Sequence, residues 1–365
     1  MPLCRALIVY LIFTTATAFA QQRRGRSLEP WVKGAFKTQD VNSDGVVTKD
    51  EAKGLLKSNF ARVDADSDGK VTPDELQVVA KQIRADRNRT NQQKKGDQRS
   101  AKVPDNVELK TDIAYRPDHK RQTLDLMLPK EKSEQPRPAL VIIHGGGWRG
   151  GDKGGGMWRS LPLQYASKGY VCISVNYRLT PDGVDIFDCI EDCRCAVRWL
   201  RANAEKYNVD PKRIGAFGNS AGAHLVSLIG LTPDDTSFDG DAPYKGHSSG
   251  FQAVCCGAPP TNFMDFGKDR KQANPVLFGK VKDGAKRASP VTWVNDNAPP
   301  FLIIHGTKDG TVPVKNGDDL NAALKKVGAD VTYLRIDGAG HGAVGQHREK
   351  TYPAMEEFFA RVLKP

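Results

Sequence analysis

Short, mainly apolar runs recur along the carboxyl-terminal two thirds of the chain, and each run ends in a glycine-containing turn. The clearest are Ala139–Ile143, Arg213–Phe217, Phe301–His305 and Val331–Ile336. Runs of this length bounded by turn residues indicate strands that are buried on both faces, as in a parallel sheet. Helix-forming segments separate the runs, so the pattern predicts an α/β fold built on one doubly wound sheet.

One of these turns carries a serine between closely spaced glycines. Residues 218–222 read Gly-Asn-Ser-Ala-Gly, and small and apolar residues follow from Ala221 to Leu228. A strand that enters Gly-x-Ser-x-Gly and leaves as a helix forms a nucleophile elbow. The serine then lies on a strained turn that has no room for neighbouring Cβ atoms. The pattern therefore predicts that Ser220 is a nucleophile.

Further loops after predicted strands hold the residues that such a serine needs. The first strand runs into His144–Trp148, which reads His-Gly-Gly-Gly-Trp, and backbone N–H groups of such a loop can face a developing oxyanion. Asp309 follows the third strand, and His341 lies in a glycine-bounded loop after the last strand. His341 is predicted to be the general base and Asp309 the acid that orients it. Asp337 is the alternative acid, because it lies close to His341 in sequence.

With these loops in the order serine, aspartate, histidine, the chain from about Asn106 to its C-terminus resembles a secreted α/β-hydrolase of the esterase/lipase superfamily. It is similar to small carboxylesterases and to acetyl- or feruloyl-type esterases that carry a His-Gly-Gly-Gly-Trp loop. The resemblance implies acyl transfer to water without a catalytic metal or cofactor. It assigns the nucleophile to Ser220, the base to His341 and the orienting acid to Asp309. It assigns the three oxyanion donors to the backbone N–H groups of Gly146, Gly147 and Ala221.

The expected substrate is a carboxylic ester with a short acyl group, acetyl above all, on a small molecule or a polysaccharide side chain. This expectation rests on the resemblance and on the segment Pro259–Pro299, where the fold often inserts a lid and which is short for a lipase lid. Three alternatives stay open. A formamidase shares the glycine loop, a prolyl-oligopeptidase-like peptidase shares the triad order, and a calcium-dependent adhesion or scaffold protein would use an inactive hydrolase fold.

The amino-terminal part contains an acidic motif twice. Residues 40–51 and 64–75 both fit D-x-[DN]-x-[DN]-G-x₅-E, the EF-hand calcium loop. Calcium takes about six to eight oxygen ligands, which the loop supplies from side chains at positions 1, 3, 5 and 12 and from a backbone carbonyl at position 7. The predicted Ca²⁺ ligands are Asp40, Asn42, Asp44, Val46 and Glu51 in the first loop, and Asp64, Asp66, Asp68, Lys70 and Glu75 in the second.

The short period of this repeat leaves room for one helix between the loops, at about 50–63. Because that helix must serve both loops, we expect a small all-α EF-hand pair at 28–84 that is more compact than a calmodulin lobe. Val47 and Val71, at position 8 of each loop, are suited to pairing the loops through a short strand. We expect the pair to be structural or to serve in docking, not to act as a calcium switch.

The remaining segments define the domain boundaries. A basic residue, a short apolar stretch and an Ala-x-Ala end predict a cleaved signal peptide at 1–20 and export to the periplasm or outside the cell. No later segment is apolar enough to cross a membrane. The chain has a formal charge of +11, and residues 85–105 are rich in Lys, Arg, Gln and Asn without interleaved aromatics. This composition favours a basic linker over a stripe that binds nucleic acid or an anionic polysaccharide, so the catalytic domain is expected at 106–365.

Six cysteines follow the predicted signal peptide, and export would permit disulfides. Their spacing matches no zinc pattern. We expect several of them to be buried as small apolar residues in the sheet and helices, with one disulfide as the alternative. The six are Cys172, Cys189, Cys193, Cys195, Cys255 and Cys256.

Overall fold

The computed structural model of the chain describes residues 38–53, 56–57, 60–76, 78, 101–266 and 277–364. The chain forms two compact units, residues 1–97 and residues 98–365. The predicted signal peptide and residues 85–100 of the predicted linker lie outside the described residues. Among the helices that the structure describes, none is both long and apolar enough to cross a membrane.

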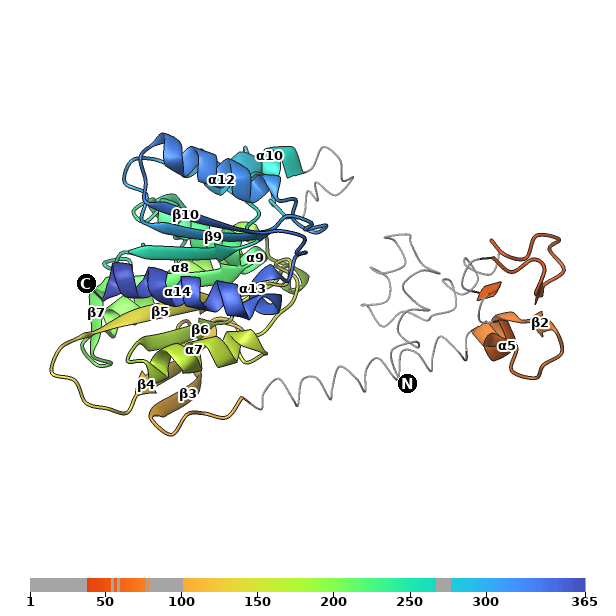
Figure 1. The fold of residues 1–365 in the computed structure, drawn as a ribbon, viewed down its shortest axis with the longest axis horizontal. Coiled ribbons are helices and arrows are strands. Elements are labelled where there is room, and N and C mark those ends of the chain that lie inside the picture. The colour runs from red at the N-terminus through yellow and green to blue at the C-terminus, as the bar shows by residue number, and fades with distance from the viewer. Residues whose placement is uncertain are drawn as a thin grey trace. The chain divides into compact units, whose positions relative to one another are not determined.

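The second unit is built on one eight-stranded sheet (Figure 1). The strands lie side by side in the order β10-β9-β8-β7-β5-β6-β4-β3. The strands from β10 to β6 in this order are parallel to their neighbours, whereas β4 is antiparallel to both β3 and β6. The predicted doubly wound sheet is confirmed, with one antiparallel strand near its edge. The strands are β3 (Val107–Ala114), β4 (Thr123–Pro129), β5 (Arg137–Ile143), β6 (Val171–Val175), β7 (Val209–Asn219), β8 (Ala253–Gly257), β9 (Phe301–Gly306) and β10 (Val331–Ile336).

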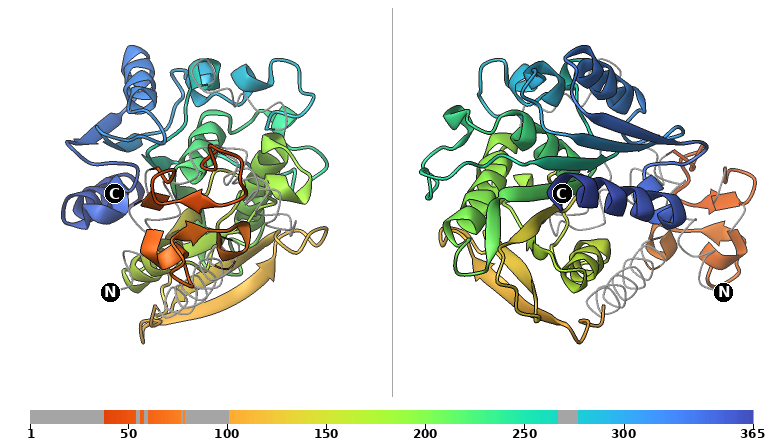
Figure 2. Two further views of the ribbon diagram at one scale, coloured as in Figure 1. Left: turned by 90° about the vertical axis from the view of Figure 1, so that its right-hand side faces the viewer. Right: turned by 60° about the vertical axis from the view of Figure 1, so that its left-hand side comes forward.

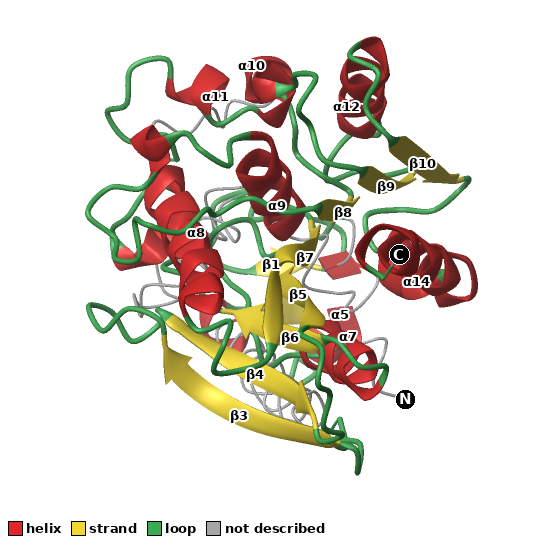
Figure 3. Ribbon diagram, turned by 90° about the vertical axis from the view of Figure 1, so that its left-hand side faces the viewer, coloured by secondary structure: helices red, strands yellow, loops and turns green. Residues whose placement is uncertain are grey.

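The central strands are buried on both faces, because alternate residues along each strand belong to different hydrophobic cores. On β5, Ala139, Val141 and Ile143 belong to one core, and Leu140 and Ile142 belong to the other. This alternation explains the continuous apolar runs of the sequence, since a parallel sheet needs cover on both faces. The first core is covered by α8 (Ile186–Ala202), α9 (Ala221–Leu231) and α12 (Lys315–Lys326), and the second by α7 (Met157–Ser167) and α14 (Arg348–Leu363) (Figure 3).

The carboxyl ends of the parallel strands bring distant loops together. Ser220 follows β7 directly, whereas Asp309 and His341 follow β9 and β10. Because these strands run in the same direction, their carboxyl ends lie at one edge of the sheet. The short helix α13 (Ala343–Gln346) follows His341, and α14 then packs across β7, β8 and β9 (Figure 2).

The segment between β8 and β9 contains only short elements in its described residues, 258–266 and 277–300. They are α10 (Phe263–Phe266), α11 (Gly284–Arg287) and the 3-10 turn η4 (Pro290–Trp293). Phe263 is buried in the core that α9 and α12 cover, and Trp293 packs against that core. The described part of this segment therefore extends the core and has no long helix of its own.

The first unit joins its two acidic loops by a short antiparallel ladder. β1 (Val47–Thr48) pairs with β2 (Lys70–Val71), and Val47 lies directly opposite Val71, which confirms the predicted pairing. The predicted helix begins later than expected: residues 50–53 are not helical, residues 56–57 are helical, and α5 is Phe60–Val63. The small core of this unit consists of Val47, Ala52, Leu56, Phe60, Val63 and Val71.

All six cysteines of the second unit are buried, and their thiols are free. Burial raises the pKa of these thiols, to about 12 for Cys195 and for Cys256. The prediction that they serve as small buried residues is confirmed. The alternative of a disulfide is wrong for these six positions.

Candidate active site

Ser220 lies at the sharp turn between β7 and α9. Its φ is +58°, in the left-handed region that residues with a side chain rarely adopt. A Cβ on Gly218 would come within 2.3 Å of the Gly222 backbone, and a Cβ on Gly222 within 2.1 Å of the carbonyl oxygen of Ile143. The N–H of Ser220 donates to the carbonyl oxygen of Gly257 on β8 at 2.8 Å. The glycines are therefore required by space, and β8 fixes the turn that presents the serine.

The side chains of Ser220, His341 and Asp309 form one chain of hydrogen bonds. Oγ of Ser220 lies 2.9 Å from Nε2 of His341, and Nδ1 of His341 lies 2.7 Å from Oδ2 of Asp309. An ionised carboxylate only accepts hydrogen bonds, so Nδ1 carries the histidine proton and Nε2 accepts from the serine hydroxyl. The structure brings together the three side chains that the sequence singled out.

The carboxylate of Asp309 is also held by its own loop. Oδ1 accepts hydrogen bonds from the N–H groups of Thr311 (2.8 Å) and Val312 (2.9 Å). Burial acts to raise the pKa of Asp309, but hydrogen bonds from His305, His341 and the loop N–H groups outweigh burial and lower the pKa well below its usual range. Asp309 is therefore an anion at neutral pH, as an orienting acid must be.

Asp337, the alternative acid, has a different partner. Its Oδ1 accepts a hydrogen bond from Oγ1 of Thr307 at 2.9 Å, and Oγ1 of Thr307 accepts one from the N–H of Gly338 at 2.9 Å. These bonds tie the loop after β10 to the loop after β9. The carboxylate bonded to His341 is that of Asp309, and Asp337 braces the loop that carries the histidine.

The glycine loop after β5 packs directly on the serine turn. A Cβ on Gly145 would lie 2.6 Å from the carbonyl oxygen of Asn219 and 3.3 Å from Cβ of Ser220. A Cβ on Gly146 would lie 2.2 Å from the carbonyl oxygen of Gly150, within the loop itself. Neither position has room for a side chain, so glycine is what allows the loop backbone to approach the serine.

The predicted oxyanion donors lie on the two segments that meet there. Gly146 and Gly147 have φ values of +120° and +62°, which glycine adopts without strain. Ala221 is the first residue of α9, and N–H groups in the first turn of a helix have no partner within that helix. The assignment of these three N–H groups to an oxyanion hole stays a prediction.

His144 orders the glycine loop as a buried, neutral residue. Its ring stacks on Tyr177 with centroids 4.5 Å apart, and burial lowers the pKa of His144 to about 4. Nη2 of Arg121 lies 3.3 Å from Nε2 of His144 and donates to the carbonyl oxygen of Gly151 at 3.0 Å. Arginine only donates, so the proton of His144 is on Nδ1, which donates to the carbonyl oxygen of Gly145 at 2.8 Å. Sequence analysis missed Arg121, because a lone arginine outside any motif carries no signal.

A buried ion pair anchors the far end of the same loop. Nζ of Lys153 lies 2.5 Å from Oδ1 of Asp125 on β4 and 2.6 Å from Oδ1 of Asp112 on β3. The N–H of Lys153 donates to Oδ1 of Asn176 at 2.8 Å, and Oγ of Ser174 on β6 donates to its carbonyl oxygen at 3.0 Å. Lys153 therefore fastens the loop after β5 to β3, β4 and β6, a role that no sequence motif indicates.

An aromatic cluster packs beside the serine turn. The ring centroid of Trp148 lies 5.3 Å from that of His224, and the centroid of Phe263 lies 5.7 Å and 5.1 Å from those of Trp148 and His224. His224 is buried on α9, and its Nε2 donates to the carbonyl oxygen of Ala288 at 2.7 Å. The cluster connects the glycine loop to the segment between β8 and β9.

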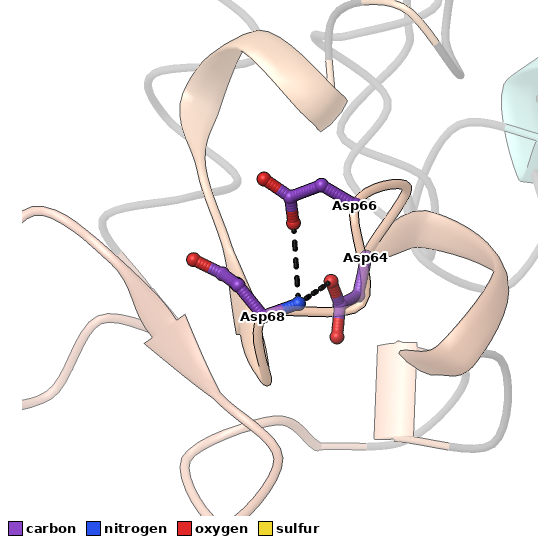
Figure 4. A group of neighbouring side chains, drawn as sticks. All are labelled: Asp64, Asp66 and Asp68. Atoms are coloured by element: carbon purple, nitrogen blue, oxygen red, sulfur yellow. Dashed lines mark hydrogen bonds between the residues drawn. The ribbon is translucent and has the colours of Figure 1, made fainter.

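The second acidic loop of the first unit gathers three carboxylates (Figure 4). One oxygen from each of Asp64, Asp66 and Asp68 lies within 4.8 Å of the others. The N–H of Asp68 donates to Oδ1 of Asp64 at 3.1 Å and to Oδ1 of Asp66 at 3.2 Å. Oε1 of Glu75 accepts from the N–H of Ala65 at 2.8 Å, which joins the end of the loop to its start. This set of converging oxygen atoms fits a hard cation such as Ca²⁺.

The first acidic loop has the same arrangement of contacts. The N–H of Asp44 donates to Oδ1 of Asp40 at 3.2 Å and to Oδ1 of Asn42 at 2.9 Å. Oε2 of Glu51 accepts from the N–H of Thr48 at 2.9 Å, and hydrogen bonds from Thr48 lower the pKa of Glu51. Burial acts to raise the pKa of Glu75, but hydrogen bonds from Thr72 and Ala65 outweigh burial and lower it. The carboxylate at position 12 is thus ionised and folded back on the loop in both copies.

The turn positions of the two loops also agree. Gly45 and Gly69 have φ values of +86° and +80°, which a side chain would strain. The N–H of Val46 donates to Oδ1 of Asp44 at 3.0 Å, and the N–H of Lys70 donates to Oδ1 of Asp68 at 2.8 Å. The backbone carbonyl ligands predicted at Val46 and Lys70 stay predictions.

Two protein families match parts of the chain. Residues 124–324 match the family described as BD-FAE, and residues 56–80 match the family described as EF hand. The first match includes Ser220 and Asp309 and ends before His341. The second match includes the whole of the second acidic loop.

Curated relatives of the chain include mycobacterial esterases. Esterase LipC of Mycobacterium tuberculosis is 32% identical over 237 residues, which cover 62% of this chain and 58% of LipC. The probable carboxylic ester hydrolase LipM of the same organism is 31% identical over 241 residues, which cover 62% of this chain and 54% of LipM. The chain thus spans little more than half the length of these relatives.

Solved structures with a similar fold are also esterases. A truncated carbohydrate esterase from gut microbiota has a TM-score of 0.65 at 26% identity, covering 73% of this chain and 100% of that one. Esterase Est2 of the planctomycete Thermogutta terrifontis has a TM-score of 0.60 at 28% identity, covering 71% of this chain and 93% of that one. Because the BD-FAE match alone covers more than half of the 365 residues, this chain belongs to the BD-FAE family of α/β-hydrolases.

Proposed function

We propose that the second unit is a serine hydrolase that cleaves carboxylic esters. The observation that carries this proposal is the hydrogen-bonded chain from Ser220 through His341 to Asp309 at the carboxyl edge of the sheet. The names of LipC and LipM as an esterase and a probable carboxylic ester hydrolase support the reaction class. The two solved esterases with the same fold support it as well.

In the proposed reaction, Oγ of Ser220 attacks the ester carbonyl carbon while Nε2 of His341 takes the hydroxyl proton. Asp309 keeps the proton of His341 on Nδ1 and stabilises the imidazolium that forms. The predicted oxyanion donors meet the negative charge that develops on the carbonyl oxygen. The imidazolium then gives its proton to the leaving alcohol, and an acyl group remains on the serine. Water repeats the sequence as nucleophile and releases the carboxylic acid.

Removing either reacting side chain tests this proposal. Ser220→Ala and His341→Ala are expected to lower the turnover of p-nitrophenyl acetate by about four orders of magnitude, because the three residues act as a unit. A fluorescent phosphonate should label the wild type but not Ser220→Ala. Ser167→Ala, which changes a half-buried serine at the end of α7, is the matched control and should keep full activity and labelling. Wild-type turnover in Ser220→Ala contradicts the proposal.

Within this reaction class, we propose short acyl groups as substrates, acetyl above all, on small molecules or polysaccharide side chains. The described residues between β8 and β9 form no helix longer than four residues. The similar Thermogutta esterase has structures with butyrate and with propionate bound, and another similar structure is a carbohydrate esterase. A p-nitrophenyl ester series from acetate to palmitate, with acetylated and feruloylated polysaccharides, tests the specificity. A maximum at decanoate or longer esters contradicts it.

The same assays separate an esterase from an amide hydrolase. Dipeptidyl aminopeptidase BIII of Pseudoxanthomonas mexicana is 26% identical over 266 residues, which cover 68% of this chain but only 37% of that enzyme. Dipeptide anilides and formyl amides therefore belong in the substrate panel. A higher kcat/KM for an amide than for every ester would favour a peptidase or formamidase, and the absence of phosphonate labelling would favour an inactive scaffold.

We propose in addition that both acidic loops of the first unit bind Ca²⁺. For the second loop, the EF-hand match and the cluster of three carboxylates support this assignment. For the first loop, the support is the same motif with the same internal hydrogen bonds and the pairing of Val47 with Val71. The role proposed for the metal is structural: the predicted ligand residues of each loop would hold one ion, and the bound ions would stabilise the two loops together, because β1 pairs with β2. Because the second unit has its own core, ester turnover should not require Ca²⁺.

We also propose that the protein is exported and that residues 1–20 are removed as a signal peptide. The sequence pattern described above supports this proposal. Determining the first residue of the mature protein recovered outside the cytoplasm tests it. A mature chain that still begins at Met1 contradicts the cleavage.

A further inference from the structure

A second histidine, besides His341, contacts the carboxylate of Asp309. His305 is the last but one residue of β9, and its side chain is fully buried. Nε2 of His305 lies 3.3 Å from Oδ2 of Asp309, the same oxygen that Nδ1 of His341 approaches at 2.7 Å. This Nε2 also lies 3.0 Å from the carbonyl oxygen of Val312. One imidazole nitrogen therefore contacts both ends of the loop from Asp309 to Val312.

The neighbours of His305 determine where its proton lies. Both atoms near Nε2 accept hydrogen bonds, so Nε2 carries a proton that the two acceptors share. Nδ1 is buried and has no hydrogen-bond partner within the part of the chain that the structure describes. A proton on Nδ1 would be a buried donor without an acceptor, which is unfavourable. His305 is therefore a neutral imidazole that is protonated at Nε2.

The Nδ1 side of His305 is enclosed by α12 and β10. A Cβ on Gly317 of α12 would lie 2.7 Å from Nδ1 of His305 and 2.7 Å from the hydroxyl oxygen of Tyr333. That hydroxyl donates to Oδ1 of Asp318 at 2.9 Å, and Nε of Arg335 lies 3.5 Å from the same oxygen. Glycine is unfavourable in a helix interior, so the approach of these two side chains explains its presence at position 317.

We propose that His305 is a positioning residue for the reaction, which holds Asp309 and its loop in place through the single proton on Nε2. This inference rests on the proposed hydrolase function. A neutral donor suits the task, because it fixes Oδ2 of Asp309 without cancelling the negative charge that stabilises the imidazolium of His341. Burial acts to raise the pKa of Asp309, and the hydrogen bond from His305 is one of those that lower it.

Two substitutions at this position separate a positioning role from a packing role. His305→Phe keeps an aromatic ring but removes the donor, and His305→Gln keeps an N–H group at a similar distance from the backbone. The kcat for p-nitrophenyl acetate is expected to fall about tenfold in His305→Phe, the effect of losing one hydrogen bond to a charged group. KM should be unchanged, because His305 does not touch the substrate, and His305→Gln should restore most of the loss in kcat.

A stability control and a second route to the same contact complete the test. Phe301→Leu changes a fully buried residue at the other end of β9, and it should lower the melting temperature without changing kcat. Gly317→Ala keeps His305 but crowds its Nδ1, and it should lower kcat with KM unchanged. Gly246→Ala is the matched control, because a Cβ there meets nothing within 4 Å.

The outcomes distinguish this inference from the proposed function. A wild-type kcat in His305→Phe, or a loss that His305→Gln does not restore, overturns the positioning role while ester hydrolysis stands. If His305→Phe does not fold, a wild-type kcat in Gly317→Ala overturns it instead. Wild-type turnover in Ser220→Ala, measured alongside, overturns the hydrolase proposal itself.

Discussion

Replacing Lys153 by methionine is expected to destabilise the second unit by about 3–5 kcal/mol. Nζ of Lys153 lies 2.5 Å from Oδ1 of Asp125, and the two side chains are only 6% and 3% exposed. At an effective dielectric constant of about 20, unit charges at this separation attract each other by roughly 7 kcal/mol, and most of this offsets the cost of taking both charges out of water. Removing the lysine alone leaves the charge of Asp125 buried without its cation, which is why the expected loss is large.

A surface ion pair of the same length provides the control. Nζ of Lys315 lies 2.5 Å from Oδ2 of Asp319 on α12, but these side chains are 65% and 31% exposed. Lys315→Met is expected to cost about 0.5 kcal/mol or less. The double variant Lys153→Met with Asp125→Leu should recover most of the loss of Lys153→Met, because it leaves neither charge in the interior.

Urea unfolding monitored by tryptophan fluorescence measures these free energies. A cost below about 1 kcal/mol for Lys153→Met would refute the argument that burial sets the strength of this pair, and so would additive losses in the double variant. Because Lys153 ends the loop that begins with the glycines beside Ser220, the esterase kcat of Lys153→Met is also expected to fall.

Other variants and conditions test the remaining parts of the molecule. Asp309→Asn is expected to lower kcat about 10⁴-fold by favouring the wrong histidine tautomer, whereas Asp337→Asn should have a mild effect; the reverse ranking in steady-state kinetics would make Asp337 the acid. Burial lowers the pKa of His224 from 6.5 to about 4. As the pH falls from 6.5 to 4, this histidine is therefore protonated in the unfolded chain before it is protonated in the folded one, and the protein loses about 3 kcal/mol of stability. Urea unfolding at pH 7 and pH 4.5 should show that His224→Asn loses less stability than the wild type does, and an equal loss would contradict this role of His224. The second acidic loop offers four carboxylates at ligand positions and the first offers three, so calorimetry should show that Glu75→Gln removes a tighter Ca²⁺ site than Glu51→Gln does. Chelation should leave p-nitrophenyl acetate turnover intact, and a loss of turnover that Ca²⁺ restores would contradict independent units.

The sequence predicted those parts of the site that follow from local pattern. Ser220, Asp309 and His341 each come after an apolar strand and lie among glycines or other turn residues. Once the strands are taken as parallel, topology alone places these loops at one edge of the sheet. The calcium loops could be predicted for the same reason, since all their ligand positions lie within twelve consecutive residues.

The supporting residues could not be predicted, because their partners are distant in sequence. Arg121 contacts His144, which is 23 positions away, and Lys153 contacts Asp125, which is 28 positions away. The role of His305 could not be predicted either, since nothing in the neighbouring sequence indicates that its ring faces Asp309. Strand β3 gave no clear signal either, because it lies at the edge of the sheet and most of its side chains are partly or fully exposed.

The buried free thiols allow the opening of the second unit to be measured without introducing any label. A thiol reacts with an alkylating reagent as an exposed thiolate, so each of these cysteines reacts only when the element around it opens. Comparing alkylation rates by mass spectrometry would yield the free energy of opening for separate parts of the fold. Equal rates would show that the sheet and α8 open together, and unequal rates would identify the part that opens first. The reporters are Cys172 on β6, Cys189, Cys193 and Cys195 on α8, and Cys255 and Cys256 on β8.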